Sequence, residues 1–447
     1  SLARGARPLG GRLLAVVGGD PTLIPNTGLV VTGTGANRTL TITPANFSGD
    51  TDLTVTATDL AGFSAIGRVH VRVSWWDARP LDQVGIQRFE QWRWLDSDLD
   101  GRLDLFGYAP IGTSMPQLFS YHNLGGAQFE SVSNNLPGWT GDGFFVGGLG
   151  GDNVADVLTL QRPDYQTALF RLWQGTGAGF NFVPMPEVSN RAAVVSYKWV
   201  DLNNDGWRDV VHFGWVTPAP PNAPPWAMLF ARGKPDGTFE YLTNRIGMYS
   251  GTAIAAVDFD LDGDFDLAVS GQDYTSGQNP GAVFSRLYRN EGGFNFTPVT
   301  AGLPQGVAYN LSVADMDQDG WPDLLLNPAS PTSTNRPVLM RNVGGSFVAV
   351  PSDLPTQLDL ASWADIDNDG DPDLVSVTSV DLTVLSFDAS RARVFRNDGG
   401  VLTPADLGLP AIAAHQASFA DVDNDGDLDL LISGETGWNV TGRYLCL

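Results

Sequence analysis

The sequence predicts an all-β protein in which a small N-terminal β-sandwich precedes a seven-bladed β-propeller. Three observations predict this fold. A nine-residue Asp-rich pattern recurs along residues 77–447, hairpin signals rich in Asn and Gly recur with it, and residues 13–76 tend to alternate apolar and polar side chains. The composition agrees, because 52 Gly, 29 Pro and only 17% charged residues are typical of short strands joined by tight turns.

The repeated pattern is D-x-[DN]-x-D-G-x-x-D. Six intact copies begin at Asp96, Asp201, Asp258, Asp315, Asp365 and Asp421. A seventh, degenerate copy spans Gly148–Asp156, with Gly148 and Gly150 where the first two acidic residues should be. Successive copies begin 50 to 57 residues apart. A period of this length predicts a repeat architecture in which each copy marks one structural unit.

Each unit also carries strand and turn signals around its Asp-rich loop. An apolar run such as Leu324–Leu326 follows the loop, and a hairpin signal such as Arg289–Gly293 or Arg341–Gly345 comes later. Asn and Gly supply the positive φ that tight hairpins need. We therefore expect four strands in each unit, which is typical of a propeller blade. A linear β-solenoid is the alternative, but its coils are shorter and carry no regular Asn-Gly hairpin.

The spacing of the loop residues suits calcium, which takes six to eight oxygen ligands at about 2.3–2.6 Å. Side chains at loop positions 1, 3 and 5 point inward, Gly at position 6 permits a sharp turn, a carbonyl at position 7 adds an oxygen, and the acid at position 9 closes the cage. In the loop that begins at Asp258, four carboxylates converge with no lysine or arginine inside the loop, and this packing is repulsive unless a cation is bound.

The sequence thus predicts about six calcium sites, and none at the degenerate loop Gly148–Asp156. The predicted calcium ligands are Asp96, Asp98, Asp100 and Asp104; Asp201, Asn203, Asp205 and Asp209; Asp258, Asp260, Asp262 and Asp266; Asp315, Asp317, Asp319 and Asp323; Asp365, Asp367, Asp369 and Asp373; and Asp421, Asp423, Asp425 and Asp429.

The formal net charge of −24 argues against nucleic acid and anionic membranes as partners, because both attract basic surfaces. The ligand positions of the seven loops hold 25 of the 50 acidic residues. Six calcium ions would bring the net charge to about −12. No run of 18 apolar residues is present, so we expect no membrane-spanning segment.

The Asp-rich units resemble the VCBS/FG-GAP repeat family, whose members are similar to the integrin α-subunit propeller. The resemblance rests on Phe419–Leu430 (FADVDNDGDLDL) and its six relatives, and it covers about residues 85–447. It implies a seven-bladed propeller with calcium in the loop between the first two strands of a blade, and an extracellular or cell-surface location. The FG and GAP motifs of the family are poorly matched in this sequence, and the second loop is degenerate. The chain therefore looks closer to the bacterial VCBS type.

Residues 13–76 resemble the later strands of a bacterial cadherin-like or immunoglobulin-like module. Residues 1–12 are expected to be disordered or to be the end of a fragment, and the apolar run Leu13–Val17 is too short for a signal-peptide core. Because the opening strands of such a module are not evident, we expect the chain to be part of a longer multidomain protein.

The last unit of the propeller raises the question of how the ring closes. Its sequence has an Asp-rich loop, a second strand and a candidate third strand at Gly442–Leu447, but no Asn-Gly hairpin and no fourth strand. Either Arg79–Phe89 supplies the missing strand or the last blade is incomplete, and the sequence favours an incomplete blade.

No recognisable catalytic motif is present, so we interpret the chain as non-enzymatic. Its four histidines, interpreted as surface or packing residues, are His70, His122, His212 and His415. The single cysteine, Cys446, is a poor catalytic candidate. The leading hypothesis is a secreted or cell-surface adhesion module whose loops hold a glycan or protein ligand on one face. Aromatic candidates for stacking on sugar rings, with packing between blades as their alternative role, are Trp139, Trp226, Tyr274 and Trp438.

Two other functions stay open. One is a calcium-dependent polysaccharide lyase or hydrolase, because some such enzymes use propellers with similar loops; a lyase would need a Lys, His, Arg or Tyr base beside a cation. The other is a purely structural segment of a large adhesin.

Overall fold

The computed structural model divides the chain into two compact units, each described here by itself. Unit 1 comprises Ser1–Ala78 with Ala405–Pro410, and unit 2 comprises Arg79–Pro404 with Ala411–Leu447. The division at Ala78 lies two residues beyond the boundary expected from the sequence. The structure describes residues 13–17, 24, 27, 29–33, 39–43, 49–58, 64–73, 78–84, 86, 91–109, 117–132, 143–147, 154, 156–164, 167–176, 180–183, 197–215, 226–247, 249–273, 282–304, 310–327, 336–355, 358, 360–377, 393–405, 409, 413–437 and 440–446.

Unit 1 contains two antiparallel sheets in its described part. The three-stranded sheet has the order β1-β4-β5, and the two-stranded sheet pairs β2 with β3. The strands are β1 (Leu13–Val17), β2 (Leu29–Thr32), β3 (Thr39–Ile42), β4 (Gly49–Thr58) and β5 (Ser64–Val73). Their alternating residues place one side chain in two toward a small core around Ile24 and Leu53, both fully buried.

Unit 2 contains seven four-stranded antiparallel sheets in its described part, which we number 1 to 7 in chain order. In sheets 1 to 6 the four strands follow one another along the chain, each pairing with the next. These strands are β7 (Gln91–Leu95), β8 (Asp104–Ala109), β9 (Gln117–Gly125) and β10 (Gln128–Val132); β11 (Gly143–Gly147), β12 (Asp156–Asp164), β13 (Thr167–Gly175) and β14 (Phe180–Val183); β15 (Tyr197–Val200), β16 (Asp209–Trp215), β17 (Trp226–Gly233) and β18 (Phe239–Ile246); β19 (Tyr249–Val257), β20 (Asp266–Asp273), β21 (Ala282–Asn290) and β22 (Phe296–Val299); β23 (Asn310–Ala314), β24 (Asp323–Asn327), β25 (Val338–Asn342) and β26 (Phe347–Val350); and β27 (Leu360–Ala364), β28 (Asp373–Val377), β29 (Arg393–Asn397) and β30 (Leu402–Ala405).

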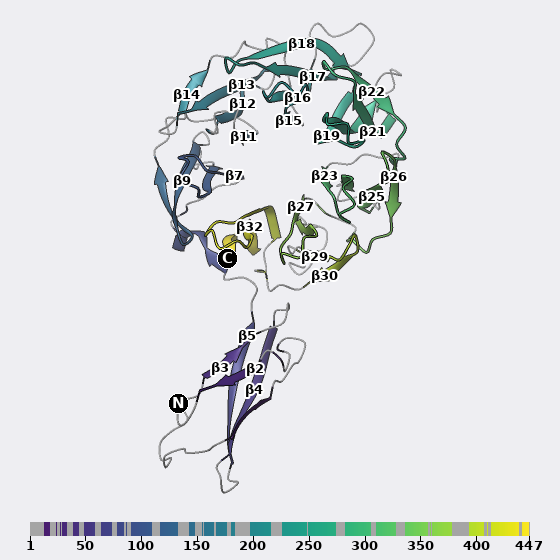
Figure 1. Ribbon diagram of the computed structural model, residues 1–447. Coiled ribbons are helices and arrows are strands. Elements are labelled where there is room, and N and C mark those ends of the chain that lie inside the picture. The colour runs from purple at the N-terminus through teal and green to yellow at the C-terminus, as the bar shows by residue number, and fades with distance from the viewer. Residues whose placement is uncertain are drawn as a thin grey trace. The chain divides into compact units, whose positions relative to one another are not determined.

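The sheets of unit 2 follow one another around a ring (Figure 1). The first strands, such as β11, β15 and β19, lie toward the centre, and the fourth strands, such as β14 and β18, lie outside. The arrangement is a β-propeller-like fold. Neighbouring sheets cover both faces of each second strand, so these strands carry continuous apolar runs. All five residues of β24 are buried, including Leu324–Leu326.

Sheet 7 corrects the expectation of an incomplete last blade. Its order is β31-β32-β33-β6, with β31 (Ala413–Ala420), β32 (Asp429–Gly437), β33 (Val440–Cys446) and β6 (Ala78–Pro80). The fourth strand therefore comes from the segment that precedes sheet 1, and it overlaps the range Arg79–Phe89 that the sequence offered as the alternative. A strand of three residues carries too little periodicity to be recognised from sequence.

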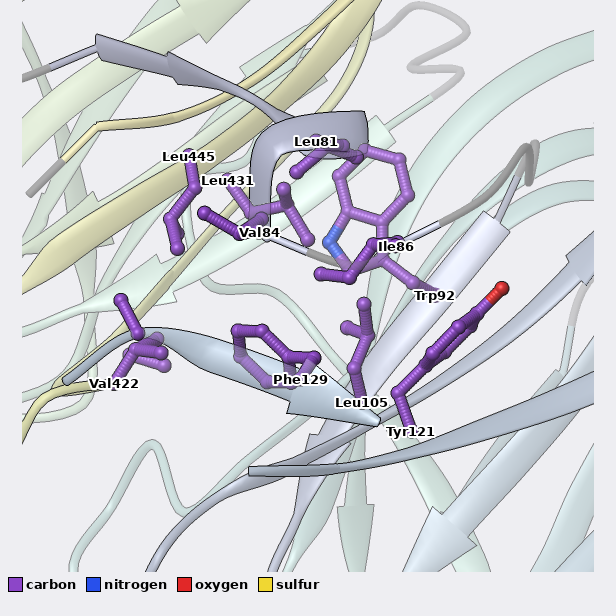
Figure 2. Close-up of a cluster of buried hydrophobic side chains, with 12 residues drawn as sticks. Leu81, Val84, Ile86, Trp92, Leu105, Tyr121, Phe129, Val422, Leu431 and Leu445 are labelled. Carbon is purple, nitrogen blue, oxygen red and sulfur yellow. The ribbon is translucent and has the colours of Figure 1, made fainter. Parts of the chain in front are cut away.

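The junction between sheets 7 and 1 is packed as well as paired. The short 3-10 helix η2 (Leu81–Val84) follows β6 directly. Its Leu81 and Val84 join one buried cluster with Trp92 of sheet 1 and with Leu431 and Leu445 of sheet 7 (Figure 2). The same short segment thus closes both the hydrogen-bonded sheet and the apolar core. No helix in the described ranges is long and apolar enough to span a membrane.

Candidate metal centres

The Asp-rich loops connect the first and second strands of their sheets, and we number each loop by its sheet. Loop 1 spans residues 96–104, loop 3 spans 201–209, loop 4 spans 258–266, loop 5 spans 315–323, loop 6 spans 365–373 and loop 7 spans 421–429. Loop 2 is the degenerate copy, of which only positions 154 and 156 are described. The prediction that loop 2 binds no calcium therefore falls largely outside the described residues.

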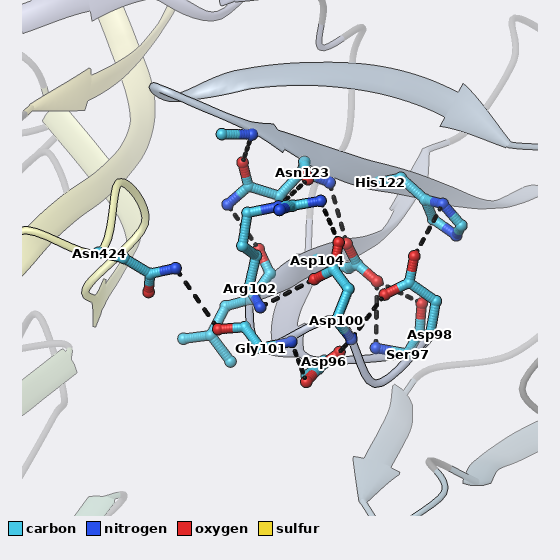
Figure 3. Close-up of polar contacts among 12 residues, drawn as sticks. Asp96, Ser97, Asp98, Asp100, Gly101, Arg102, Asp104, His122, Asn123 and Asn424 are labelled. Atoms are coloured by element: carbon cyan, nitrogen blue, oxygen red, sulfur yellow. Dashed lines mark hydrogen bonds and ion pairs between the residues drawn. The ribbon is translucent and has the colours of Figure 1, made fainter.

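Carboxylates at positions 1 and 5 fold each loop onto its own backbone, as loop 1 illustrates (Figure 3). Asp96 accepts hydrogen bonds from the backbone N–H groups of Asp100 (3.1 Å) and Gly101 (2.9 Å). Asp100 in turn accepts one from the N–H of Arg102 (2.9 Å). Gly101 has φ of 86°, a left-handed conformation that glycine adopts without a Cβ clash. The sequence assigned these carboxylates only to calcium. In the structure they also hold the loop in shape by accepting hydrogen bonds from its backbone.

Carboxylates at position 3 leave buried oxygens without a hydrogen-bond donor. Within the described residues, this is true of Oδ1 of Asp260, Asp317 and Asp367. The side chains of Asp317 and Asp367 are only 7% and 6% exposed. A buried carboxylate oxygen without a partner is costly, on the order of 1–3 kcal/mol or more.

A cation is the partner that these oxygens lack. In loop 1, ligand atoms of Asp96, Asp98 and Asp100 lie within 4.8 Å of one another. Similar groups in the other loops are Asp258, Asp260 and Asp262; Asp315, Asp317 and Asp323; and Asp365, Asp367 and Asp373. Hard, clustered oxygen ligands are those that calcium takes, so the residues present fit the ion. Loop 3 offers fewer carboxylate oxygens to a cation, because position 3 is Asn203 and its amide nitrogen donates to Asp205 Oδ2 (2.9 Å).

The carboxylate at position 9 has a structural role that the sequence did not reveal. Asp266, fully buried, accepts hydrogen bonds from the N–H groups of Phe259 (3.1 Å) and Asn290 (2.7 Å). It therefore joins the loop, the second strand and the third strand of its sheet. Asp104, Asp209, Asp323 and Asp373 make the corresponding pair of contacts in their sheets.

The degenerate loop keeps this structural acid. Asp156 is fully buried and accepts a hydrogen bond from the N–H of Gly175 (2.9 Å). The pattern has lost its first two acids here and has retained the one that bonds to backbone. Main-chain hydrogen bonding thus explains why an acidic residue stands at position 9 even in a loop where calcium is not expected.

Burial raises the pKa of the position 9 carboxyls of loops 3 to 7 well above the usual range. The pKa rises to about 7 for Asp209, Asp266 and Asp429, and to about 6 for Asp323 and Asp373. Neighbouring loop carboxylates raise it further, and backbone hydrogen bonds oppose the rise. A bound cation would reverse the balance, because positive charge favours the ionised carboxylate.

Arginines of the third strands reach the loops, a contact that the sequence did not reveal. Arg289, in the hairpin signal of sheet 4, lies 3.4 Å from Asp260 Oδ2. Arg396 Nη2 lies 2.8 Å from Asp367 Oδ2, and Arg341 pairs with both Asp317 and Asp319. Each arginine approaches Oδ2, whereas Oδ1 of Asp260, Asp317 and Asp367 has neither a hydrogen-bond donor nor an arginine beside it. The arginine therefore holds the outer oxygen and leaves the inner one for a cation.

The asparagine after each of these arginines links neighbouring sheets. Asn290 Nδ2 donates to the carbonyl of Leu202 in loop 3 (2.7 Å), and Asn397 Nδ2 donates to that of Met316 in loop 5 (2.7 Å). In sheet 1, Asn123 Nδ2 donates to the carbonyl of Val422 in loop 7 (2.7 Å). This last bond joins sheets 1 and 7, the first and last sheets of unit 2.

Replacing such an asparagine is expected to destabilise unit 2. Asn342 is fully buried, and its Nδ2 donates to Phe259 O (2.8 Å) and Pro322 O (3.2 Å). Asn342→Ala leaves buried carbonyls without donors and should lower the free energy of unfolding by about 2–4 kcal/mol in denaturant titrations. The exposed Asn295, which bonds only within its turn at Gly292 (3.0 Å), provides the matched control. Equal losses for Asn295→Ala and Asn342→Ala would contradict the inter-sheet role.

His70 and His212 lie in opposite structural settings, the first exposed and the second buried. His70 of unit 1 is exposed and lies 2.9 Å from Asp52 Oδ1. His212 of β16 is 1% exposed and stands edge-on to Tyr241, with ring centroids 6.5 Å apart. Burial lowers the pKa of His212 to about 4. The side chain of His415 lies outside the described residues.

This shifted pKa predicts acid sensitivity. Between the unfolded value near 6.5 and the folded value near 4, the unfolded chain binds a proton that the folded chain excludes. Stability therefore falls as the pH falls through this window, by about 2 kcal/mol between pH 7 and pH 5. His212→Leu should lose this part of the pH dependence, measured as the difference in unfolding free energy between the two pH values. An unchanged pH dependence in the variant would contradict the assignment.

Unit 2 contains a cavity of about 400 Å³ on the side of the first strands. It is lined by residues of the first strands β15, β19, β23 and β27, among them Lys198, Asn310 and Ser312. Lys198 is half-buried, and burial, followed by the positive charge of Arg93, lowers its pKa. The sequence did not single out this lysine as a site residue. Of the aromatic candidates, Trp226 begins β17, and its side chain lies outside the described residues, as do Trp139, Tyr274 and Trp438.

Comparison with known proteins found no matching family model and no matching curated protein. Among solved structures, the chain is similar to a rhamnogalacturonan lyase PL11 of Bacillus licheniformis, at 11% identity and a TM-score of 0.42, over 98% of this chain and 91% of that one. It is also similar to the GH32 β-fructofuranosidase of Bombyx mori, at 11% identity and a TM-score of 0.30, over 90% of this chain and 88% of that one. Neither likeness assigns a function to this chain.

Proposed function

We propose that residues 77–447 form a closed, seven-bladed β-propeller of the VCBS/FG-GAP type, stabilised by calcium and serving as a ligand-binding module outside the cell. The buried Oδ1 atoms of Asp260, Asp317 and Asp367 carry this proposal, because each lacks a donor inside a group of carboxylates. Residues 13–76 would then be a cadherin-like or immunoglobulin-like module of a secreted or cell-surface protein.

The proposed role of calcium is to stabilise the structure of the loops. Side chains at loop position 4 reach the next loop around the ring, as Asn204 Nδ2 does to Asp264 Oδ1 (2.6 Å) and Asn368 Nδ2 does to Asp427 Oδ1 (2.7 Å). Ordering one loop therefore helps to order its neighbour. A rigid ring of loops suits a face that presents the connecting segments to a glycan or a protein ligand.

Binding arrays test this function. Purified protein should bind members of a glycan or protein array in calcium and lose that binding in chelator. An array that stays blank in calcium would instead favour a purely structural segment of an adhesin.

A second candidate function rests on Lys198. A polysaccharide lyase needs a base beside its substrate, and a lysine whose pKa is lowered in a cavity is suited to that role. Acidic polysaccharides incubated with the protein would then develop the absorbance of an unsaturated uronate. Lys198→Ala should abolish that absorbance, and Lys234→Ala, which removes a lysine paired at 4.0 Å with Glu240, should not. If no acidic polysaccharide developed this absorbance, the ligand-binding module would be favoured over the lyase.

A further inference from the structure

Loop 1 differs from loops 4, 5 and 6 in the side chain that the third strand sends to it. Sheets 4, 5 and 6 place Arg289, Arg341 and Arg396 there, immediately before the inter-sheet asparagine. Sheet 1 has His122 before Asn123. An arginine is a fixed cation and cannot bind a metal ion, whereas neutral imidazole offers a nitrogen lone pair.

His122 stands at ligand distance from two loop carboxylates. Ligand atoms of Asp98, Asp104 and His122 all lie within 4.8 Å of one another. His122 Nδ1 is 3.5 Å from Asp98 Oδ2 (Figure 3). That is long for a hydrogen bond. It is close to the separation of about 3.4 Å expected for two ligands that share a tetrahedral ion at 2.0–2.1 Å.

The remaining acceptor capacity of Asp104 also fits an ion. Asp104 is 1% exposed. Its Oδ2 accepts hydrogen bonds from the N–H of Ser97 (3.0 Å) and from the Ser97 hydroxyl, and its Oδ1 accepts one from the N–H of Asn123 (2.9 Å). A carboxylate has about four lone-pair positions, so one remains on Oδ1. The three hydrogen bonds fix this buried carboxylate on a rigid strand end.

We propose that Asp98 and Asp104, which are calcium ligands of loop 1 in the function proposed above, form together with His122 a site that takes a first-row transition ion in preference to calcium, with zinc as the probe. One nitrogen and two carboxylate ligands suit zinc, which leaves a fourth position for water. Calcium takes oxygen ligands and gains nothing from the imidazole. The site is thus distinct in chemistry from the loops in which arginine occupies the same place.

Zinc titration of the full chain, with calcium in large excess, tests this site. The wild-type protein should bind one zinc ion by calorimetry. His122→Arg, which installs the residue found in sheets 4 to 6, should weaken zinc binding at least tenfold. The calcium content of the chain, measured in parallel, shows whether the variant keeps its other loops folded.

His70→Arg provides the matched control, because His70 also lies beside an aspartate but is exposed in unit 1. It should bind zinc as the wild-type protein does. Zinc binding that survives His122→Arg, that is lost in His70→Arg, or that is absent from the wild-type protein in excess calcium would overturn the proposal. None of these results bears on calcium in loops 4 to 6, so the two assignments can fail separately.

Discussion

Removing calcium is expected to lower the melting temperature of unit 2 by on the order of 10–20 °C. An ion that binds only the folded state stabilises it by about 2.7 kcal/mol when present at a hundredfold excess over its dissociation constant. Several such sites add up, and their loss leaves like-charged carboxylates together with buried oxygens that have no partner. Scanning calorimetry in calcium and in chelator measures the difference.

Magnesium supplies the control for simple charge screening. It demands near-octahedral geometry and dehydrates reluctantly, so it should restore only part of the lost stability at the same concentration. Full recovery in magnesium would mean that ionic strength, and not a fitted site, stabilises the loops.

Asp156→Ala is expected to lower the free energy of unfolding by about 2–4 kcal/mol without changing the number of bound calcium ions. The substitution removes a fully buried acceptor from the N–H of Gly175, and that donor is then left without its carboxylate. Denaturant titration gives the stability, and metal analysis gives the calcium content.

Asp317→Asn is the matched comparison, because it changes a position 3 carboxylate with little change of shape. It should remove one calcium ion, and its loss of stability should be seen in calcium and be small in chelator. If Asp156→Ala lost a calcium ion, or if Asp317→Asn kept all of them, the division between structural and ligand carboxylates would be wrong.

The sheets of unit 2 could be predicted because their signals are local. An Asp-rich loop, an apolar run such as Leu324–Leu326 and an Asn-Gly turn all lie within one unit, and repetition makes each signal stronger. The closing strand Ala78–Pro80 has no such signal, because it pairs with a strand more than 350 residues away in the sequence. The position of this strand depends on closure of the whole ring of sheets.

The sequence predicted which residues make up the candidate sites, but it did not predict the role of each one. The sequence indicated which acids belong to a loop, but it did not separate Asp317, whose inner oxygen lacks a donor, from Asp323, which holds two backbone N–H groups. Nor did it show that Arg341 turns back to loop 5. These roles depend on contacts between different strands of a sheet, which a linear pattern does not contain.

The number of calcium ions bound per chain distinguishes fitted metal sites from acidic turns. The protein is dialysed against buffer with calcium as its sole divalent cation, and its metal content is measured by mass spectrometry against protein concentration. We expect six calcium ions, one for each intact loop and none for loop 2. A chain that retains no calcium under these conditions would show that the Asp-rich loops are turns and not calcium sites.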